Sequence, residues 1–165
     1  MRHFGNLMAA LVLSIGVFIA AESAYAIDFT EDELAMLQRG RTVRKPLADS
    51  MKDGYFAGSG WALIDAPADV VWAAIQDWGA YRDVFPRTVG ATELSRDKQR
   101  SVIRMELGYR IMSVKYHLNI TKNPEQKTMS FGLAGDKRHD IDSARGFWRV
   151  FPQKDGRTLL GYVVA

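Results

Sequence analysis

The sequence predicts a single α+β domain, a curved antiparallel sheet of about six to seven strands with a short helix after the first main strand. Two observations lead to this prediction. From Val89 onward, apolar residues recur mostly with a period of two, which is typical of half-buried strands. Before that point, the stretch from Gly58 to Pro86 has the pattern of a strand, a proline-started helix and an aromatic loop.

Composition and length agree with this fold class. The chain has 165 residues, of which 47% are hydrophobic and 25% charged, and its formal net charge is +3. These are values of a globular protein. The basic residues are scattered among acidic ones, so we expect no nucleic-acid partner. The absence of cysteine excludes disulfides, thiol nucleophiles and thiolate metal sites.

Residues 1–26 have the layout of a secretory signal peptide. A basic start precedes an apolar run over about residues 7–21, and the segment closes on Ala24-Tyr25-Ala26, a small-x-small cleavage pattern. The alternative is an uncleaved anchor helix, but the run is short for a bilayer span and Glu22 ends it. We therefore expect a periplasmic or secreted protein whose mature chain starts near Ile27.

Residues 27–57 are expected to form an N-terminal helix and a polar lead-in. Thr30 and Glu33 make a capping-box pattern, and Gly40 is a suitable residue for the end of the helix. The lead-in has room for a short edge strand around Thr42 to Arg44.

The first main strand is predicted over Tyr55 to Ile64. Asp65-Ala66-Pro67 follows, with Asp65 as the expected cap and Pro67 in the first turn of a helix that runs to about Trp78. Five apolar residues at helical spacing should form one stripe: Val70, Val71, Ala74, Ile75 and Trp78. Gly79 ends the regular helix. The loop after it carries three bulky side chains: Tyr81, Val84 and Phe85.

Further strands are expected over Gly90–Leu94, Val102–Arg110, Ser113–Thr121, Thr128–Ala134, Gly146–Pro152 and Arg157–Val164. Charged or turn-forming segments separate them, among them Asn123 to Gln126 and the hairpin turn Lys154-Asp155-Gly156. Such a sheet curves by its own twist and leaves a concave apolar face that another element must cover.

The central stretch resembles a known superfamily. Trp61-Ala-Leu-Ile-Asp-Ala-Pro-Ala-Asp-Val-Val-Trp72, followed by Asp77-Trp78-x-x-Tyr81 and Phe85-Pro86, resembles the START-like, or Bet v 1-like, SRPBCC superfamily. The most similar branch comprises polyketide cyclase/dehydrase and coenzyme Q-binding Coq10-type proteins. The later residues that match are Gly146, Trp148, Pro152, Thr158 and Tyr162. The resemblance covers roughly Gly58 to Val164.

The resemblance implies a helix-grip fold, in which a seven-stranded sheet curls around a long C-terminal helix and leaves a deep apolar cavity. This sequence departs from the pattern because it lacks that long helix. An uncovered concave face would be an unusual apolar patch for a soluble monomer. Either a partner covers it or the chain is a fragment. We expect the latter, with residues 58–165 forming a START-like domain incomplete at its C-terminus.

A cavity for a hydrophobic ligand needs apolar walls and a few polar groups that orient the ligand. The inward positions of the strands supply candidate walls: Met105, Leu107, Tyr116, Leu118, Phe131 and Trp148. Trp78, Tyr81 and Phe85 are candidates for the entrance. Each residue taken alone is better explained as ordinary core. For the set as a whole, the resemblance favours a ligand-binding role.

The polar groups give little support for catalysis. Tyr109, Tyr116 and Arg104 are the ones expected nearest the cavity, and an exterior salt bridge with Glu106 or with a neighbouring strand explains Arg104 better. Asp77 is more typical of a helix cap than of a general base. No hydrolase, zinc-protease or phosphate-loop motif is present.

The histidines do not suggest a metal site. His117 alternates with apolar residues and should point to the outer face. His139 lies beside Asp140 and Asp142 among basic neighbours, a pattern more typical of a solvated loop than of a metal site. We expect neither a metal nor a cofactor.

These observations predict an exported binding or transport domain for a lipid, quinone or similar apolar molecule, with transient membrane contact as a further expectation. One alternative is an aromatase/cyclase-type enzyme acting on a polyketide-like chain. The signal peptide counts against it because carrier-bound polyketide intermediates are cytoplasmic. Another alternative is an interaction module whose open sheet face docks a partner.

Overall fold

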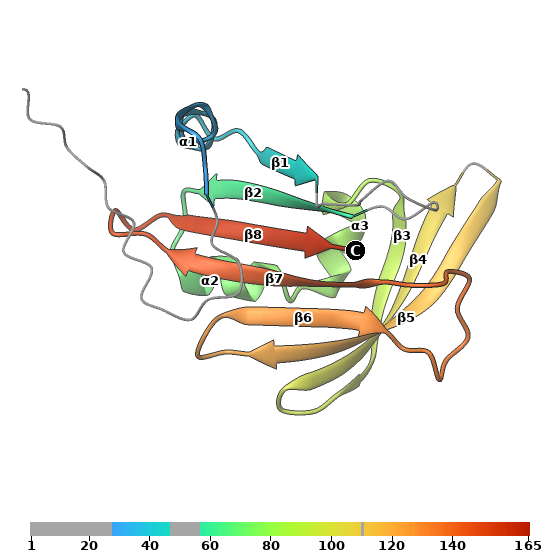
Figure 1. The fold of residues 1–165 in the computed structure, drawn as a ribbon. Coiled ribbons are helices and arrows are strands. Elements are labelled where there is room, and N and C mark those ends of the chain that lie inside the picture. The colour runs from blue at the N-terminus through green and yellow to red at the C-terminus, as the bar shows by residue number, and fades with distance from the viewer. Residues whose placement is uncertain (1–27, 47–56, 110) are drawn as a thin grey trace, which may run out of the picture.

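A computed structural model of the protein describes residues 28–46, 57–109 and 111–165. The described chain forms an eight-stranded antiparallel sheet in the order β1-β2-β8-β7-β6-β5-β4-β3, with short helices on both sides (Figure 1). The α+β prediction is confirmed, with one strand more than expected. The predicted signal peptide lies outside the described residues.

All the strands predicted after Val89 are present, with ends shifted by a few residues. They are β3 (Thr88–Arg96), β4 (Arg100–Tyr109), β5 (Met112–Asn123), β6 (Thr128–Leu133), β7 (Arg145–Pro152) and β8 (Thr158–Val164). The register places Met105 opposite Tyr116, Ile120 opposite Phe131, and Trp148 opposite Tyr162. Because partners across an antiparallel pair share a face, this register gathers apolar side chains on one side of the sheet.

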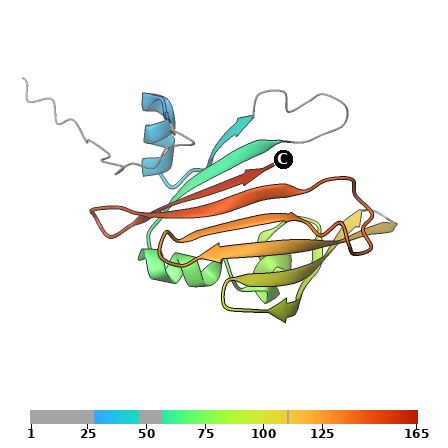
Figure 2. The ribbon, with the colours of Figure 1, turned by 60° about the horizontal axis from the view of Figure 1, so that its bottom comes forward.

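Helix α1 (Glu31–Gln38) and helix α2 (Ala68–Ala74) lie on opposite sides of the sheet (Figure 2). Beneath α1 is a small core on the outer, convex face. Its buried residues are Leu37, Val43 and Trp61, with Phe29, Met36, Leu63, Phe151, Leu159 and Val163 packed against them. Strand β1 (Val43–Pro46) pairs with β2 (Gly58–Ile64) and extends the sheet at that edge.

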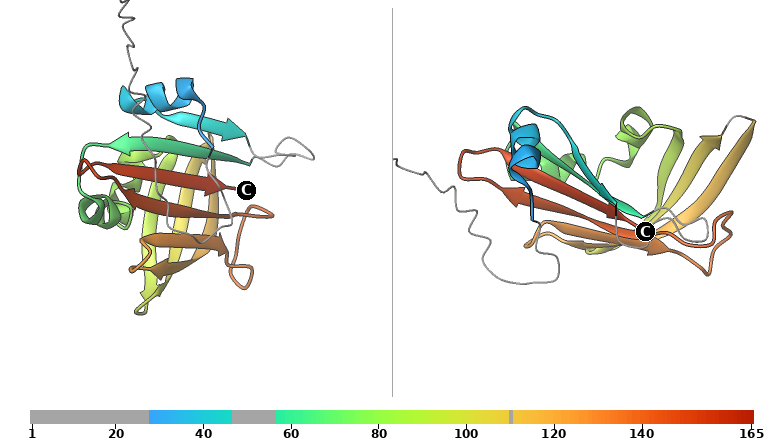
Figure 3. Two further views of the ribbon diagram at one scale, coloured as in Figure 1. Left: turned by 60° about the vertical axis from the view of Figure 1, so that its left-hand side comes forward. Right: turned by 45° about the horizontal axis from the view of Figure 1, so that its top comes forward.

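The main core lies on the concave face, between the sheet and the helical segment that follows β2 (Figure 3). Its buried residues are Val71, Ile75, Trp78, Tyr81, Ile103, Met105, Leu118, Ile120, Met129 and Val150. The strand residues in this core alternate with outward-facing ones, as the period of two predicted. Within the part of the chain that the structure describes, no helix is long and apolar enough to span a bilayer.

The helical segment differs from its prediction in three respects. Helix α2 ends at Ala74, and a 3₁₀-helix η1 (Trp78–Ala80) and a short helix α3 (Tyr81–Val84) replace the expected loop. Pro67, not Asp65, is the N-cap residue, and no side chain caps α2, because the helix starts only after the extended Pro67. The predicted stripe is narrower: Val70 is 57% exposed and Ala74 is exposed, because the segment packs on the core through Val71 and Ile75.

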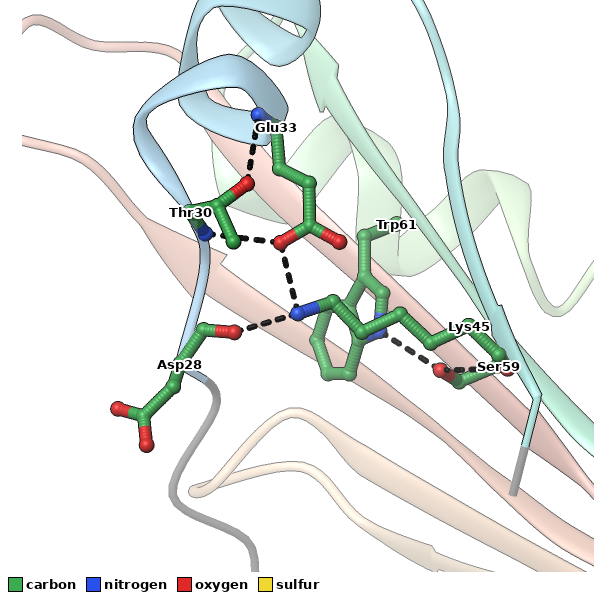
Figure 4. A network of polar contacts seen from close by, with 6 residues as sticks. All are labelled: Asp28, Thr30, Glu33, Lys45, Ser59 and Trp61. Atoms are coloured by element: carbon green, nitrogen blue, oxygen red, sulfur yellow. Dashed lines mark hydrogen bonds and ion pairs between the residues drawn. The ribbon is translucent and has the colours of Figure 1, made fainter. Parts of the chain in front are cut away.

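Polar contacts join α1, β1 and β2 on the convex side (Figure 4). The predicted capping box is present: Glu33 N donates to Thr30 Oγ1 at 3.2 Å, and Thr30 N donates to Glu33 Oε2 at 2.8 Å. Lys45 Nζ forms an ion pair with the same Glu33 oxygen at 2.8 Å and also donates to the Asp28 carbonyl. A single lysine therefore ties the start of α1 to the edge strand β1.

Candidate functional site

The concave face carries a group of aromatic side chains that we call the aromatic surface: Tyr81, Phe85, Tyr116, Phe131, Trp148 and Tyr162. Trp148 and Tyr162 have the closest ring centroids, 4.2 Å apart. Phe131 stacks beside Tyr162 at 5.9 Å, and Phe85 lies 5.8 Å from Trp148. Apart from the buried Tyr81, these side chains are half-buried, so part of the ring area stays accessible.

The helical segment positions two of these rings. Asp77 Oδ1 accepts hydrogen bonds from Gly79 N at 3.1 Å and Ala80 N at 3.4 Å, which confirms that it acts as a cap. The cap starts η1 and carries the chain directly into α3. The Tyr81 hydroxyl donates to the Ile75 carbonyl at 2.8 Å, and the Tyr81 ring lies 5.0 Å from Phe85. Phe85 is thereby held over β7 and β8.

A glycine in β7 lets the sheet side of the surface close up. Gly146 pairs with Phe131 across the β6–β7 ladder. A Cβ added to Gly146 would lie 2.4 Å from the Phe131 ring, so only glycine allows that ring to lie across β7. The Phe131 ring then reaches Tyr162 on β8, with an interplanar angle of 20°.

Two tyrosine hydroxyls of the aromatic surface are available to a ligand. Within residues 28–46, 57–109 and 111–165, the hydroxyls of Tyr116 and Tyr162 make no hydrogen bond. Burial raises the pKa of Tyr116, and burial together with the neighbouring Tyr116 raises the pKa of Tyr162 to about 12. Both phenols therefore stay protonated at neutral pH and can donate a hydrogen bond to a carbonyl or hydroxyl oxygen.

The predicted site residues fall into three groups. Tyr81, Phe85, Tyr116, Phe131 and Trp148 belong to the aromatic surface. Trp78, Met105 and Leu118 are buried in the main core, at 7%, 7% and 9% exposure, and support the surface from below. Leu107 is half-buried near the end of β4 and does not pack into that core. Their contact with a ligand stays a prediction.

Sequence reasoning missed Tyr162 as a site residue. It noted Tyr162 only as part of the resemblance, although the alternation in β8 would have placed it on the same face as Leu160. What the pattern could not give was the register that sets Tyr162 opposite Trp148. The side chain of Tyr109, another candidate, lies outside the described part of the chain.

The charged candidates lie away from the aromatic surface. Arg104 is exposed, and Glu106 pairs with Lys115 at 3.6 Å instead of with Arg104 as expected, because Lys115 lies directly across the β4–β5 ladder. His117 Nδ1 lies 3.0 Å from the Arg138 carbonyl, and His139 Nδ1 lies 2.7 Å from the Ile141 carbonyl. No group of acidic or histidine side chains suited to a metal ion occurs among the described residues.

A depression of about 500 Å³ opens near the β3–β4 hairpin, lined by residues 95–97, 100–102 and 119–121. Val102 and Asn119 line it, and both alternate with core positions of their strands. The depression therefore opens mainly on the convex side of β3, β4 and β5. Its polar lining makes it a poor match to an apolar ligand.

Comparisons with known proteins agree with this geometry. The sequence profile of a family described as "Polyketide cyclase / dehydrase and lipid transport" matches residues 64–164. The crystal structure of the Zhui aromatase/cyclase from Streptomyces sp. R1128 aligns with a TM-score of 0.57 and 21% identity, over 75% of this chain and 66% of that one.

Two other solved structures give similar values. A START superfamily protein from Mycobacterium smegmatis aligns with a TM-score of 0.53 and 17% identity, over 64% of this chain and 72% of that one. A STAR-related lipid transfer protein (fragment 25-204) from Xanthomonas axonopodis gives 0.53 and 16%, over 66% and 67%. At these identities the likeness shows the fold alone.

A search of curated proteins found no match. The profile nevertheless covers more than half of the chain, and the curved antiparallel sheet with few helices matches the helix-grip fold of the aligned structures. The chain belongs to the polyketide cyclase/dehydrase and lipid transport family, and its fold is that of START-like, or Bet v 1-like, SRPBCC proteins.

Proposed function

We propose that the protein binds a hydrophobic small molecule, such as a lipid or a quinone, on the aromatic surface and carries it without transforming it. The half-burial of Phe85, Phe131, Trp148 and Tyr162 on one face is the observation that carries this proposal. Covering apolar area contributes roughly 25 cal/mol per Å², before the entropic cost of association is subtracted. Aromatic rings supply such area with little loss of side-chain freedom on binding.

The family supports the ligand class. Its description includes lipid transport, and the Xanthomonas axonopodis neighbour is a STAR-related lipid transfer protein by its name. Residues 1–26 support export, so we place the protein in the periplasm or outside the cell.

Exposed apolar side chains support transient contact with a membrane surface. Ile111 and Met112 at the β4–β5 turn are 99% and 64% exposed, and Val84 and Val89 are 67% and 57% exposed. Val89 lies against Gly108, two residues before the turn, so these side chains gather at one end of the molecule. A carrier that exchanges an apolar ligand with a bilayer needs such an end.

The test is to express the full chain in a Gram-negative host, purify it from the periplasmic fraction and identify co-purifying molecules by mass spectrometry. We expect one lipid or quinone species near stoichiometric amounts in the wild type and less than a tenth of that in Trp148→Ala. Leu94→Ala, on an exposed position of β3, is the control and should keep the ligand. Protein free of apolar molecules, or recovered only in the cytoplasm with residues 1–26 attached, would contradict the proposal.

The hydroxyls of Tyr116 and Tyr162 favour a second candidate, an aromatase/cyclase activity. Two protonated phenols facing an apolar surface can polarise a ketone of a polyketide-like chain and stabilise developing negative charge on its oxygen. The test is turnover of a model poly-β-ketone by wild type, Tyr116→Phe and Tyr162→Phe. We expect no turnover. Turnover that falls tenfold or more in either variant would replace the carrier function with the enzymatic one.

A further inference from the structure

A group of polar side chains lies inside the concave face at the end where the β3–β4 hairpin turns. We call Trp78, Glu93, Ser101 and Lys122 the polar cluster. Three of its atoms are buried without a hydrogen-bond partner in the described chain: Trp78 Nε1, Glu93 Oε1 and Ser101 Oγ. Ser101 is 3% exposed and Trp78 is 7% exposed, so solvent does not readily replace the missing partners.

Lys122 brings a positive charge into this cluster. Its exposure is only 8%, and its ammonium makes no ion pair or hydrogen bond with any residue that the structure describes. Lys122 Nζ lies 5.8 Å from the Trp78 ring centroid, within the range of a cation–π contact. Burial lowers the pKa of Lys122, and the Glu93 carboxylate acts in the opposite direction.

Glu93 does not neutralise Lys122 fully, because the Glu93 carboxylate already pairs with Arg96. Arg96 Nη2 and Nε lie 2.6 Å and 2.8 Å from Glu93 Oε2, and this pairing holds the pKa of Glu93 below its usual range. The Ser101 hydroxyl lies close enough to Glu93 to lower that pKa as well. Two cations therefore face one carboxylate, and the local charge is +1.

The polar cluster is continuous with the aromatic surface. The Trp78 ring lies 5.0 Å from Tyr81, and Tyr81 lies 5.0 Å from Phe85, which contacts Trp148 and Tyr162. Trp78 thus belongs to the cluster and also begins the row of rings. One end of the candidate binding face is cationic and rich in hydrogen-bond donors, and the rest is apolar.

We propose that the polar cluster binds the carboxylate head of an amphiphilic ligand whose apolar part lies on the aromatic surface. Lys122 Nζ, Ser101 Oγ and Trp78 Nε1 supply the donors, and one negative charge balances the local +1. This inference rests on the proposed function, since it names the class of apolar ligand that is carried: a long-chain or aromatic monocarboxylic acid.

An internal water is the competing explanation. Water would satisfy the indole N–H, the serine hydroxyl and the free oxygen of Glu93. It would leave the charge of Lys122, a residue that is 8% exposed, with only the Glu93 carboxylate that Arg96 already shares, and a largely desolvated charge without its own counter-ion is disfavoured. A carboxylate can accept hydrogen bonds from the indole N–H and the serine hydroxyl and can balance the charge of Lys122, whereas a neutral ligand head leaves that charge unbalanced.

The test compares palmitate with 1-hexadecanol, which has the same chain and an uncharged head. Dissociation constants are measured by calorimetry on delipidated full-length protein from the periplasm. In the wild type, palmitate should bind at least tenfold more tightly than hexadecanol. Lys122→Met should reduce this ratio to about one, and Lys122→Arg should keep most of it. Lys127→Met, which removes an ammonium at the nearby β5–β6 turn, should leave the ratio unchanged.

Two results would overturn the inference in distinguishable ways. If both ligands bind equally well to wild type and Lys122→Met, the headgroup site is wrong and the proposed carrier function stands. If neither ligand binds any variant, both are wrong. Should Lys122→Met fail to fold by circular dichroism, Ser101→Ala and Trp78→Phe remove one donor each and should lower the ratio several-fold. An unchanged ratio in both would overturn the headgroup site.

Discussion

The two faces of the sheet use tryptophan differently. Trp61 on the convex face and Trp78 on the concave side are buried to nearly the same extent, at 5% and 7% exposure. The Trp61 indole donates to Ser59 Oγ at 3.1 Å, whereas the Trp78 indole has no partner among the described residues. A closed core pairs its buried donors because an unpaired one costs free energy. The convex core therefore pairs the donor that it buries, and under our proposal the concave face keeps unpaired groups for a ligand.

This contrast predicts a large effect of a single added methyl group on the convex face. A Cβ added to Gly161 would lie 2.0 Å from the Trp61 ring, which the neighbouring Phe29 and Phe151 rings help to fix. Gly161→Ala should lower the free energy of unfolding by about 3 kcal/mol, because the ring has no room to move. Urea denaturation followed by circular dichroism measures it.

The control for Gly161→Ala is Gly132→Ala on β6, where nothing lies within 4 Å of the added Cβ. Its effect on unfolding should stay below about 1 kcal/mol. Equal destabilisation by the two variants would show that the Trp61 contact is unimportant.

Truncating a tryptophan on each face should separate stability from binding. Trp61→Ala removes a buried ring and should cost about 3–4 kcal/mol of unfolding free energy while leaving ligand affinity per folded molecule unchanged. Trp148→Ala removes a half-buried ring and should cost about 1–2 kcal/mol, with at least a tenfold loss of affinity. Denaturation curves and calorimetric titrations on both variants check this. The opposite pattern would reverse the roles of the two faces.

The polar contacts of α1 predict an acid-dependent part of the stability. Lys45, followed by the Thr30 backbone, lowers the pKa of Glu33. A carboxyl whose folded pKa is depressed contributes stability above its unfolded pKa, and this contribution is lost as the pH falls through the folded value. Lys45→Met should therefore lower the melting temperature at pH 7 and flatten its decline below about pH 4.5. Parallel melting curves for wild type and variant would refute the role of Lys45.

The smallest effect is expected at Tyr162. Its hydroxyl has no partner among the described residues, so Tyr162→Phe should leave stability at pH 7 within about 0.5 kcal/mol. Because burial and Tyr116 raise the folded pKa to about 12, the unfolded chain ionises first, and stability falls as pH rises above about 10. Ultraviolet titration should show one late-titrating phenol fewer in the variant. Loss of an early-titrating phenol instead would place Tyr162 in solvent.

Much of the fold was predictable because its signals are local. The Thr30–Glu33 capping box, the turn before Thr128 and the alternation in β4 and β5 each depend on residues a few positions apart. The helical segment was less predictable. Its spacing fits one helix up to Trp78, but the chain breaks after Ala74, and the Asp77 cap starts a new turn that aims Tyr81 and Phe85 at the sheet.

Lys122 shows how a small error at a strand end hides a site residue. The predicted strand ended at Thr121, which left Lys122 in the approach to the turn. Strand β5 continues to Asn123, and Lys122 then follows Leu118 and Ile120 on the inward face. The alternation of inward and outward residues already indicated that position 122 faces inward, but a lysine next to a turn is more often solvated.

The sequence by itself determined the family, the order of strands along the chain and the set of apolar residues that alternate inward. Those properties follow from spacing and from short-range backbone preferences. Only the tertiary structure decided that Tyr162 stacks with Phe131 and Trp148, that α1 covers the opposite face from α2, and that Lys122 meets Trp78, Glu93 and Ser101. Strand register and sheet curvature set these contacts, and both depend on packing between residues distant in the sequence.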